Sequence, residues 1–310
     1  MREVSPMFKI AVLVTILGAL VFTFGIRGSK APLEAAGAVL LLLGAVLMTN
    51  SNNRTIAVNT FREALRNKVL YIILVFAILL IGFAVVLGSI SIGENDRVIK
   101  HVGLTAINVF GIFLAMFVGV NLVYDEMERR TIYTIIAHGV PRQDFIIGKF
   151  LGLLLTIVFN FLLMTIILSA VLVFLPDTTW SWTILYAVFM SAFEMMIIIG
   201  FAILFSSFST PVVSAVLTLG VYIIGHLSDD LLEWIKILGH DAYAFYSDKM
   251  VPLLYGIYYV LPHLEEFNVK NQVLDPGQVP LTLFPIGYGI LYTALVLTLA
   301  CLIFAKKDFR

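Results

Sequence analysis

Long runs of apolar residues are the dominant pattern along this chain. Four of them, residues 69–93, 102–124, 150–176 and 276–305, contain no charged side chain. About 20 helical residues cross the roughly 30 Å hydrocarbon core of a bilayer, so each run is long enough to span it. The strict alternation of apolar and polar residues that a transmembrane β-barrel requires does not occur. The pattern therefore predicts an integral membrane protein built from helices.

Eight membrane spans are predicted when the shorter runs are included. The first run resembles a signal peptide, but it ends in Gly-Ile-Arg-Gly (25–28), which lacks the small-x-small cleavage pattern. We therefore expect it to be a retained helix. A cluster of serine and proline at 206–211 predicts a tight turn between the sixth and seventh spans. The predicted spans are residues 8–26, 33–49, 69–87, 102–124, 150–175, 180–206, 211–227 and 285–305.

Composition supports this all-α fold class and excludes several functions. Hydrophobic residues make up 60% of the 310 residues and charged residues 13%, whereas soluble domains are roughly half apolar and a quarter charged. The net charge of zero gives no sign of a nucleic-acid partner. The single cysteine, Cys301, excludes an intrachain disulfide, and the five histidines lack metal-ligand spacing, so we expect no metal site.

The distribution of lysine and arginine orients the chain in the bilayer, because positive side chains concentrate on the cytoplasmic side of membrane proteins. If both termini are cytoplasmic, thirteen of the twenty lysines and arginines lie on that side. Arg27 and Lys30, in the first outer loop, run against the rule. We expect a multi-pass protein of the inner membrane with both termini in the cytoplasm. The thirteen residues are Arg2, Lys9, Arg54, Arg62, Arg66, Lys68, Arg129, Arg130, Arg142, Lys149, Lys306, Lys307 and Arg310.

Three segments between the spans have distinct patterns. Residues 56–70 carry apolar and polar side chains on opposite helical faces, which predicts an amphipathic helix at the cytoplasmic surface. The outer segment 228–284 contains an apolar stretch of about 14 residues, 251–264, which is too short to span and is typical of a re-entrant or interfacial hairpin. The inner loop 125–149 predicts a short helix that either transmits force to a soluble partner or rests among the lipid headgroups.

Apart from Glu34 at the start of the second span, Glu194 is the only acidic residue within a predicted span, about 12 residues from the inner end of its helix. Because a buried charge is costly at this depth, the glutamate is either a proton or substrate site facing a cavity, or a protonated or hydrogen-bonded group that joins helices. We favour the structural role, because no other ionisable side chain lies in an obvious partner span. Asn108, Asn121 and Asn160 are available as hydrogen-bond partners.

Small residues recur every four positions on the fourth predicted span, at Gly111, Ala115 and Gly119. Such a stripe lets a second helix approach closely, so it predicts a helix–helix contact. The contact lies either within one chain or across a dimer.

The chain has no phosphate-binding loop. The pattern Gly-x-x-x-x-Gly-Lys-Ser/Thr is absent, and Gly148-Lys149 lacks both the upstream glycine and the following hydroxyl residue. No other catalytic constellation occurs, so we expect no catalytic residue and no ATP hydrolysis by this chain through such a loop.

Seven short segments resemble the type-2 permeases of ATP-binding-cassette (ABC) transporters. They fall within Asn59–Arg310, about four fifths of the chain, and their order relative to six spans makes the match specific to the family. One departure is Gly-Val-Pro-Arg at 139–142, where family members often have Pro-Val-Ser-Arg. The segments are Asn59–Lys68, Glu128–Ile132, Arg142–Gly152, Phe205–Ser209, Ile224–Leu227, Leu261–Asn268 and Lys306–Phe309.

The resemblance implies a six-helix permease core in residues 54–310, with two additional transmembrane helices in residues 1–53. It implies that residues 56–70 form an elbow helix and that 125–149 is a coupling region docking on a separate ABC ATPase subunit. That subunit would hold ATP and Mg²⁺, and this chain would bind no cofactor. A second permease copy or a paralogue would complete the transporter, which in this family tends to export. The implied coupling residues are Glu128, Arg129, Arg130, Ile132, Ile135, Pro141 and Arg142.

Two other functions fit part of the pattern. A membrane-embedded enzyme or cofactor-maturation factor would use Glu194 and loop histidines, but the sequence shows no convergent polar cluster in the bilayer. An anchor or assembly protein that recruits an ATPase without transport would also explain the inner loop. A neighbouring gene for an ATPase with a phosphate-binding loop would favour the transporter, and a neighbouring oxidoreductase or ligase would favour the enzyme.

Overall fold

The computed structural model describes residues 51–91, 93–121, 124, 141–176, 178–228, 230–231, 233–234, 252–256, 258, 260–274 and 284–306. Within these ranges every regular element is a helix, and no strand occurs. The first two predicted spans, and residues 125–140 of the inner loop, lie outside the described residues. The prediction of an all-α membrane protein is confirmed.

Six apolar helices correspond to the six predicted core spans. Among the described residues, five helices are long and apolar enough to cross a membrane, and α10 is a shorter apolar helix. The helices of the structure are α3 Ser51–Arg66, α4 Lys68–Ile90, α5 Asn95–Leu114, the π-helix η1 Ala115–Gly119, α8 Arg142–Phe174, α9 Thr183–Ser206, α10 Pro211–His226, the 3₁₀-helix η3 Glu265–Phe267, α13 Lys270–Leu274 and α14 Phe284–Lys306.

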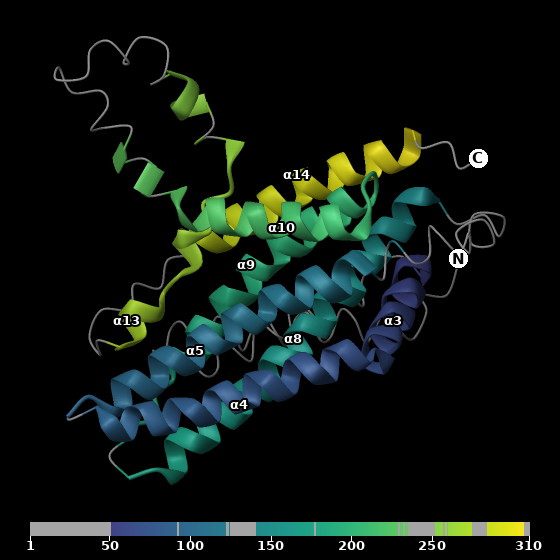
Figure 1. Ribbon diagram of the computed structural model, residues 1–310. Helices are drawn as coiled ribbons and strands as arrows, with labels where there is room; N and C mark the ends of the chain where they lie inside the picture. Colours follow the sequence, from purple (N-terminus) through teal and green to yellow (C-terminus); the bar gives the residue numbers. More distant parts are fainter. Residues whose placement is uncertain are drawn as a thin grey trace, which may run out of the picture.

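Helix α9 lies at the centre of the bundle, where it packs against α5, α8, α10 and α14 (Figure 1). In its most apolar stretch 72% of the residues are buried, compared with 28% in α4 and in α14. Helix α4 instead exposes a broad apolar face. An apolar face of this extent is stable against lipid and would be unusual on a soluble monomer. The exposed side chains of α4 include Tyr71, Ile72, Val75, Phe76, Leu79 and Phe83.

The helix that precedes the first core span, α3, turns sharply away from α4 (Figure 1). The break is at Asn67, whose backbone is extended (φ −74°, ψ 121°) and whose side chain accepts a hydrogen bond from Val69 N at 3.0 Å. An asparagine in this conformation caps the following helix. Because of this cap, α3 ends at Arg66 and does not continue to the predicted residue 70; it begins at Ser51, earlier than the predicted residue 56.

Two glycines of α8 bring α3 into close contact with it. A Cβ on Gly152 would lie 2.5 Å from Thr60 Cβ, and a Cβ on Gly148 would lie 2.7 Å from Ile56 Cβ. Any larger side chain would push α3 outward. Helix α3 and the first turns of α8 therefore pack as one unit.

Helix α5 begins at Asn95, earlier than the predicted Val102, and its first turns contain charged residues. Lys100 is almost completely buried, and its Nζ donates to Asp96 Oδ2 at 2.6 Å and to Thr179 Oγ1 at 3.0 Å. The backbone N and the hydroxyl of Thr179 also donate to the Asp96 carboxylate, both at 2.9 Å. Because these charges are paired, the helix extends beyond the apolar run and is joined to the loop between α8 and α9.

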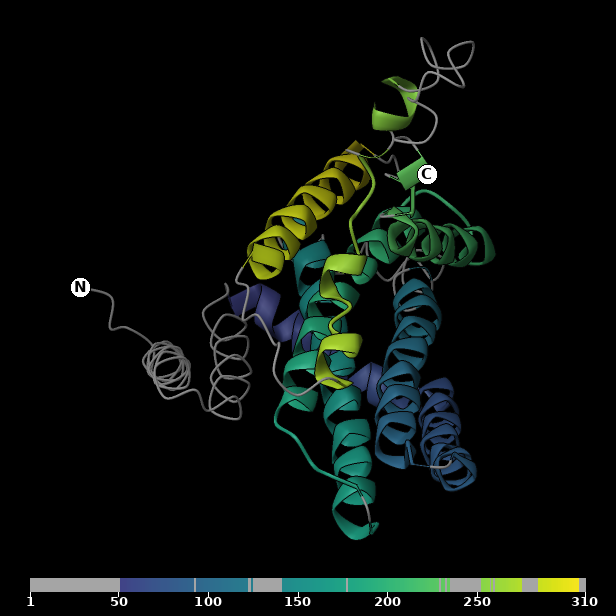
Figure 2. The same ribbon diagram turned by 90° about the vertical axis from the view of Figure 1, so that its left-hand side faces the viewer.

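The segment 260–274 folds back onto the end of the bundle opposite α3. Leu264 N donates to Gly225 O at 3.1 Å, which attaches the segment to the last turn of α10. The hydroxyls of Tyr288 and Tyr292, both on α14, bind its backbone. Elements η3 and α13 then pack against α9, and α13 also packs against α5. Figure 2 shows this segment in yellow-green between α14 and α5.

Candidate functional site

A buried carboxylate lies at the middle of α9. Glu194 is completely inaccessible to solvent. By helical rise it is about 17 Å from Thr183 and about 18 Å from Ser206, the two ends of the helix. An ionised carboxylate is costly at such a depth, so the neighbours of Glu194 decide what it does.

Asn108 of α5 is the first of these neighbours. Its Nδ2 donates to Glu194 Oε2 at 3.2 Å, and the asparagine is 1% exposed. The amide oxygen Oδ1 of Asn108 and the second carboxylate oxygen of Glu194, Oε1, are buried and have no hydrogen-bond partner among the described residues. The pair therefore presents two unsatisfied acceptors between α5 and α9.

His226, the last residue of α10, faces the same carboxylate. Its Nε2 lies 3.5 Å from Glu194 Oε1, and its Nδ1 lies 3.2 Å from Tyr222 O. A carbonyl oxygen only accepts, so Nδ1 carries a proton in this contact. Nε2 is then an acceptor in the neutral ring and a donor in the charged ring. A hydrogen bond across this 3.5 Å contact therefore needs a proton on His226 Nε2 or on Glu194 Oε1, and without it both atoms are acceptors.

Lys270 and Glu265 bring further charges to the site from η3 and α13. Glu194 interacts electrostatically with both of them. Burial lowers the pKa of Lys270, while the carboxylates of Glu194 and Glu265 act in the opposite direction and favour its charged form. Helix α13, which begins at Lys270, packs against α9, so this segment brings a lysine to the helix that carries the buried carboxylate.

The structure changes the interpretation of Glu194 that the sequence favoured. Asn108 is a hydrogen-bond partner, but Asn160 donates instead to Thr156 O on its own helix at 2.9 Å, and Asn121 lies just beyond η1. The expectation that no ionisable side chain faces Glu194 is wrong, because His226 does.

The position of His226 along the chain could have revealed this contact. It lies 15 residues after Pro211, and Glu194 lies 12 residues before Ser206, on the two helices that the tight turn joins. Helical rise places the two residues at similar depth. Lys270 gave no such signal, because it lies in a segment without long apolar runs.

The small-residue stripe on α5 and η1 packs against helices of the same chain. A Cβ on Gly111 would lie 2.6 Å from Phe161 Cζ of α8, whereas one on Gly119 would lie 3.6 Å from Ala202 Cβ of α9. Ala115 is 1% exposed. The stripe thus lets α5 and η1 approach α8 and also α9, the helix that carries Glu194.

Most of the predicted coupling residues lie outside the described residues: Glu128, Arg129, Arg130, Ile132 and Ile135. Pro141 is exposed and precedes α8 with an extended backbone (φ −60°, ψ 143°), and Arg142 is the first residue of that helix. The end of the predicted coupling region is therefore continuous with a core helix.

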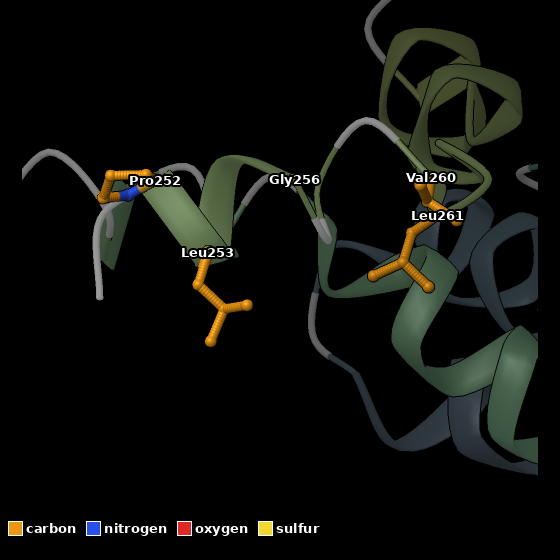
Figure 3. Close-up of a pocket in the computed structure, with 5 residues that line it drawn as sticks. All are labelled: Pro252, Leu253, Gly256, Val260 and Leu261. Carbon is orange, nitrogen blue, oxygen red and sulfur yellow. The ribbon is translucent and has the colours of Figure 1, made fainter. Parts of the chain in front are cut away.

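The predicted apolar stretch 251–264 is described in part. Pro252, Leu253 and Gly256 face Val260 and Leu261 across an open apolar hollow (Figure 3). Hollows of this kind offer contact area but little specificity, because polar groups fix the orientation of a ligand. The stretch turns inward only at its end, where Leu264 is fully buried.

The chemistry available at Glu194 is that of a proton or cation site. Among the described residues, no group of three or more histidine, cysteine, aspartate or glutamate side chains could hold a metal ion. A carboxylate with unsatisfied acceptors, an imidazole and an ammonium group can instead exchange a proton or hold a cationic donor.

Comparison with known families gives a match over most of the chain. The family described as ABC-2 family transporter protein matches residues 54–309. The matched range begins within α3 and includes all six apolar helices and the buried carboxylate. Comparison with curated proteins gives no match.

Proposed function

This chain belongs to the ABC-2 family of transporter proteins, and from that premise we propose that it is an export permease driven by a separate ATPase subunit. Membership makes it the membrane permease subunit of an ABC transporter. In our proposal the ATPase holds ATP and Mg²⁺ and docks on the inner loop 125–149. Two permease copies, or this chain and a paralogue, cross the inner membrane with both termini in the cytoplasm.

The observation that carries this proposal is the join between the inner loop and the core. Helix α8 starts at Arg142, so residues 142–149 of the loop already belong to it, and it packs against α3 at Gly148 and Gly152. Between these glycines, the nearly buried Lys149 places its Nζ 3.4 Å from Glu63 Oε2 of α3. A force applied to the loop would move α3 and α8 together, because their contact is both tight and polar.

The same helix supports a route from the loop to the buried carboxylate. Helix α8 has 33 residues and packs along α5, α9 and α14. A tilt of α8 therefore changes the packing around α9, on which Glu194 lies. Rigid elements with two discrete arrangements are the usual physical basis of such coupling. Closure of the ATPase subunits would switch the core between inward-open and outward-open states in this way.

Charge reversal in the loop tests the docking. We expect Arg129→Glu with Arg130→Glu, and separately Glu128→Lys, to abolish co-purification of the tagged chain with the ATPase encoded beside it, in lipid nanodiscs. ATP hydrolysis by the complex should fall with it. Arg62→Glu, which reverses an exposed charge of α3, is the matched control and should leave association unchanged.

Three outcomes separate the candidate functions. Loop-dependent association with stimulated hydrolysis and substrate release supports the transporter. Association without transport would leave an anchor that recruits an ATPase. Retained association after charge reversal would contradict docking on this loop, and the activity would then be sought around Glu194.

A further inference from the structure

We propose that Glu194 and Asn108 form the binding site for an ammonium group of the transported substrate, and that Lys270 holds this site closed in the structure. The proposal names a substrate class and so rests on the proposed function. It assigns the permease to compounds that carry a protonated amine.

The first argument is the kind of polar atom that the site leaves unsatisfied. Glu194 Oε1 and Asn108 Oδ1 are both acceptors, both are buried, and neither has a hydrogen-bond partner among the described residues. The bond of 3.2 Å between Asn108 Nδ2 and Glu194 Oε2 keeps the two side chains together. An unsatisfied buried acceptor is costly, and a donor removes that cost. The site therefore selects a donor, and the carboxylate selects a positive one.

The geometry fits an ammonium group better than a metal ion. An ammonium group has three donors and needs two or three acceptors. Glu194 Oε1 and Asn108 Oδ1 provide two, and neutral His226 provides a third at Nε2, 3.5 Å from the carboxylate oxygen. Metal ions in proteins take about four to eight ligands. Within the described part of the chain no cluster of metal-ligating side chains is present.

Lys270 supplies the second argument. It is the first residue of α13, it is partly buried, and its charge acts on Glu194. Helix α13 packs against α9 and α5, which carry Glu194 and Asn108, so the charged form of Lys270 compensates the buried carboxylate in this closed arrangement. Glu265 also interacts with Lys270. When a substrate amine replaces Lys270 at Glu194, the lysine can still interact with the carboxylate of Glu265. Lys270 and the substrate then compete for Glu194.

The segment that covers the site is held by backbone hydrogen bonds and by the buried side chains of Leu264, Phe267 and Val269. Residues 260–274 carry Lys270, and backbone hydrogen bonds join them to Gly225, Tyr288 and Tyr292. Release of this segment exposes Glu194 from the end of the bundle opposite α3. A ligand that binds only the open arrangement gains apparent affinity when the closed arrangement is weakened. Removal of the Lys270 charge should therefore strengthen substrate binding.

A fluorescent primary amine tests the proposal. The probe is dansylcadaverine, and its N-acetylated derivative is the uncharged control. Binding to the full-length chain in nanodiscs of zwitterionic lipid is measured by fluorescence anisotropy, with empty nanodiscs subtracted. No ATPase is needed, so the result does not depend on whether docking on the inner loop is correct. The variants are Glu194→Gln, Lys270→Ala and, as matched control, Glu266→Gln, which changes an exposed carboxylate on the same segment.

Glu194→Gln and Lys270→Ala should change the preference for the charged amine over the acetylated probe in opposite directions. The amine should bind the unaltered chain about tenfold or more tightly than the acetylated probe, because a charge-assisted hydrogen bond to a buried group is worth that much. Glu194→Gln should remove this preference, Lys270→Ala should increase it, and Glu266→Gln should leave it unchanged.

Several results would overturn the proposal. Equal binding of the two probes to the unaltered chain would show that Glu194 is protonated and takes no cation. Weaker amine binding after Lys270→Ala would mean that the lysine supports the fold and does not compete with the ligand. If Glu194→Gln fails to fold, the effect of Lys270→Ala on amine binding still tests the proposal.

Discussion

At the scale of single residues, the site depends on buried oxygen atoms that lack a hydrogen-bond partner among the described residues. Glu194 uses one carboxylate oxygen to accept from Asn108, and the other lies 3.5 Å from His226 without a hydrogen bond. Native proteins leave few buried polar atoms unpaired, so a pair of them in one place calls for a ligand, a proton or a second conformation. The sequence alone could find Glu194, because it interrupts an apolar run. It could not show which oxygen is unpaired, since that depends on helix rotation.

Two glycines of the small-residue stripe differ in the space around them, and they give a matched test of packing. Gly111→Ala should destabilise the protein by about 1–3 kcal/mol, because its Cβ would overlap Phe161. Gly119→Ala should have little effect, because Ala202 Cβ would be at an ordinary distance of 3.6 Å. Thermal unfolding of the solubilised protein, followed by size-exclusion chromatography, measures both. Equal destabilisation by the two variants would contradict the packing of α5 on α8 described above.

At the scale of elements, the length of the apolar runs predicted the core helices, and hydrogen bonds decide at which residues some of them begin and end. The apolar runs located α4, α8, α9 and α14 because a helix in lipid must bury its backbone polar groups within itself. Helix α5 starts earlier than its run because Asp96, Lys100 and Thr179 pair in space. Thr179 lies far along the chain from Asp96 and Lys100, so the pattern of apolar and polar residues could not predict that the three side chains meet. The end of α3 at Asn67 is a local capping effect and could have been predicted.

The contact between α3 and α8 gives a second test. Gly152→Ala should separate the two helices, because its Cβ would lie 2.5 Å from Thr60 Cβ and 2.7 Å from Ala57 O. We expect a destabilisation of about 1–3 kcal/mol and a loss of ATP-dependent transport with ATPase association retained. Gly82→Ala is the control, because nothing lies within 4 Å of its Cβ on α4. It should leave transport unchanged. Normal transport by Gly152→Ala would show that the contact between α3 and α8 takes no part in coupling.

At the scale of the whole molecule, the chain is a bundle closed at one end by its own segment. Helices α9 and α10 carry Glu194 and His226, and the segment 260–274 contains α13, which begins at Lys270 and packs against α9. The sequence predicted an outer segment with an inward-turning part. The contacts of η3 and α13 could not be predicted, because they follow from the folded path of a long connection.

The attachment of this segment can be measured directly. Tyr288→Phe removes the hydroxyl that accepts from His263 N at 3.0 Å. A single hydrogen bond of about 0.5–1.5 kcal/mol corresponds to amide exchange about two- to tenfold faster. Hydrogen–deuterium exchange of the peptide covering 260–268 should show this increase. Tyr71→Phe, on the exposed face of α4, is the control and should leave exchange unchanged. Unchanged exchange in Tyr288→Phe would mean that the tyrosine does not retain the segment.

The short length of α10 has a consequence for the surrounding lipid. Its 16 residues rise about 24 Å, less than the roughly 30 Å of a typical hydrocarbon core. Unless the helical residues that follow His226, where Leu231 N donates to Leu227 O, complete the span, this hydrophobic mismatch thins the bilayer beside α10 or lets water reach below the headgroups to His226. Lipids with shorter acyl chains relieve the mismatch and longer ones increase it. Bilayer thickness thus acts on the same end of α10 that contacts the buried carboxylate, so the permease should respond to the membrane in which it is placed.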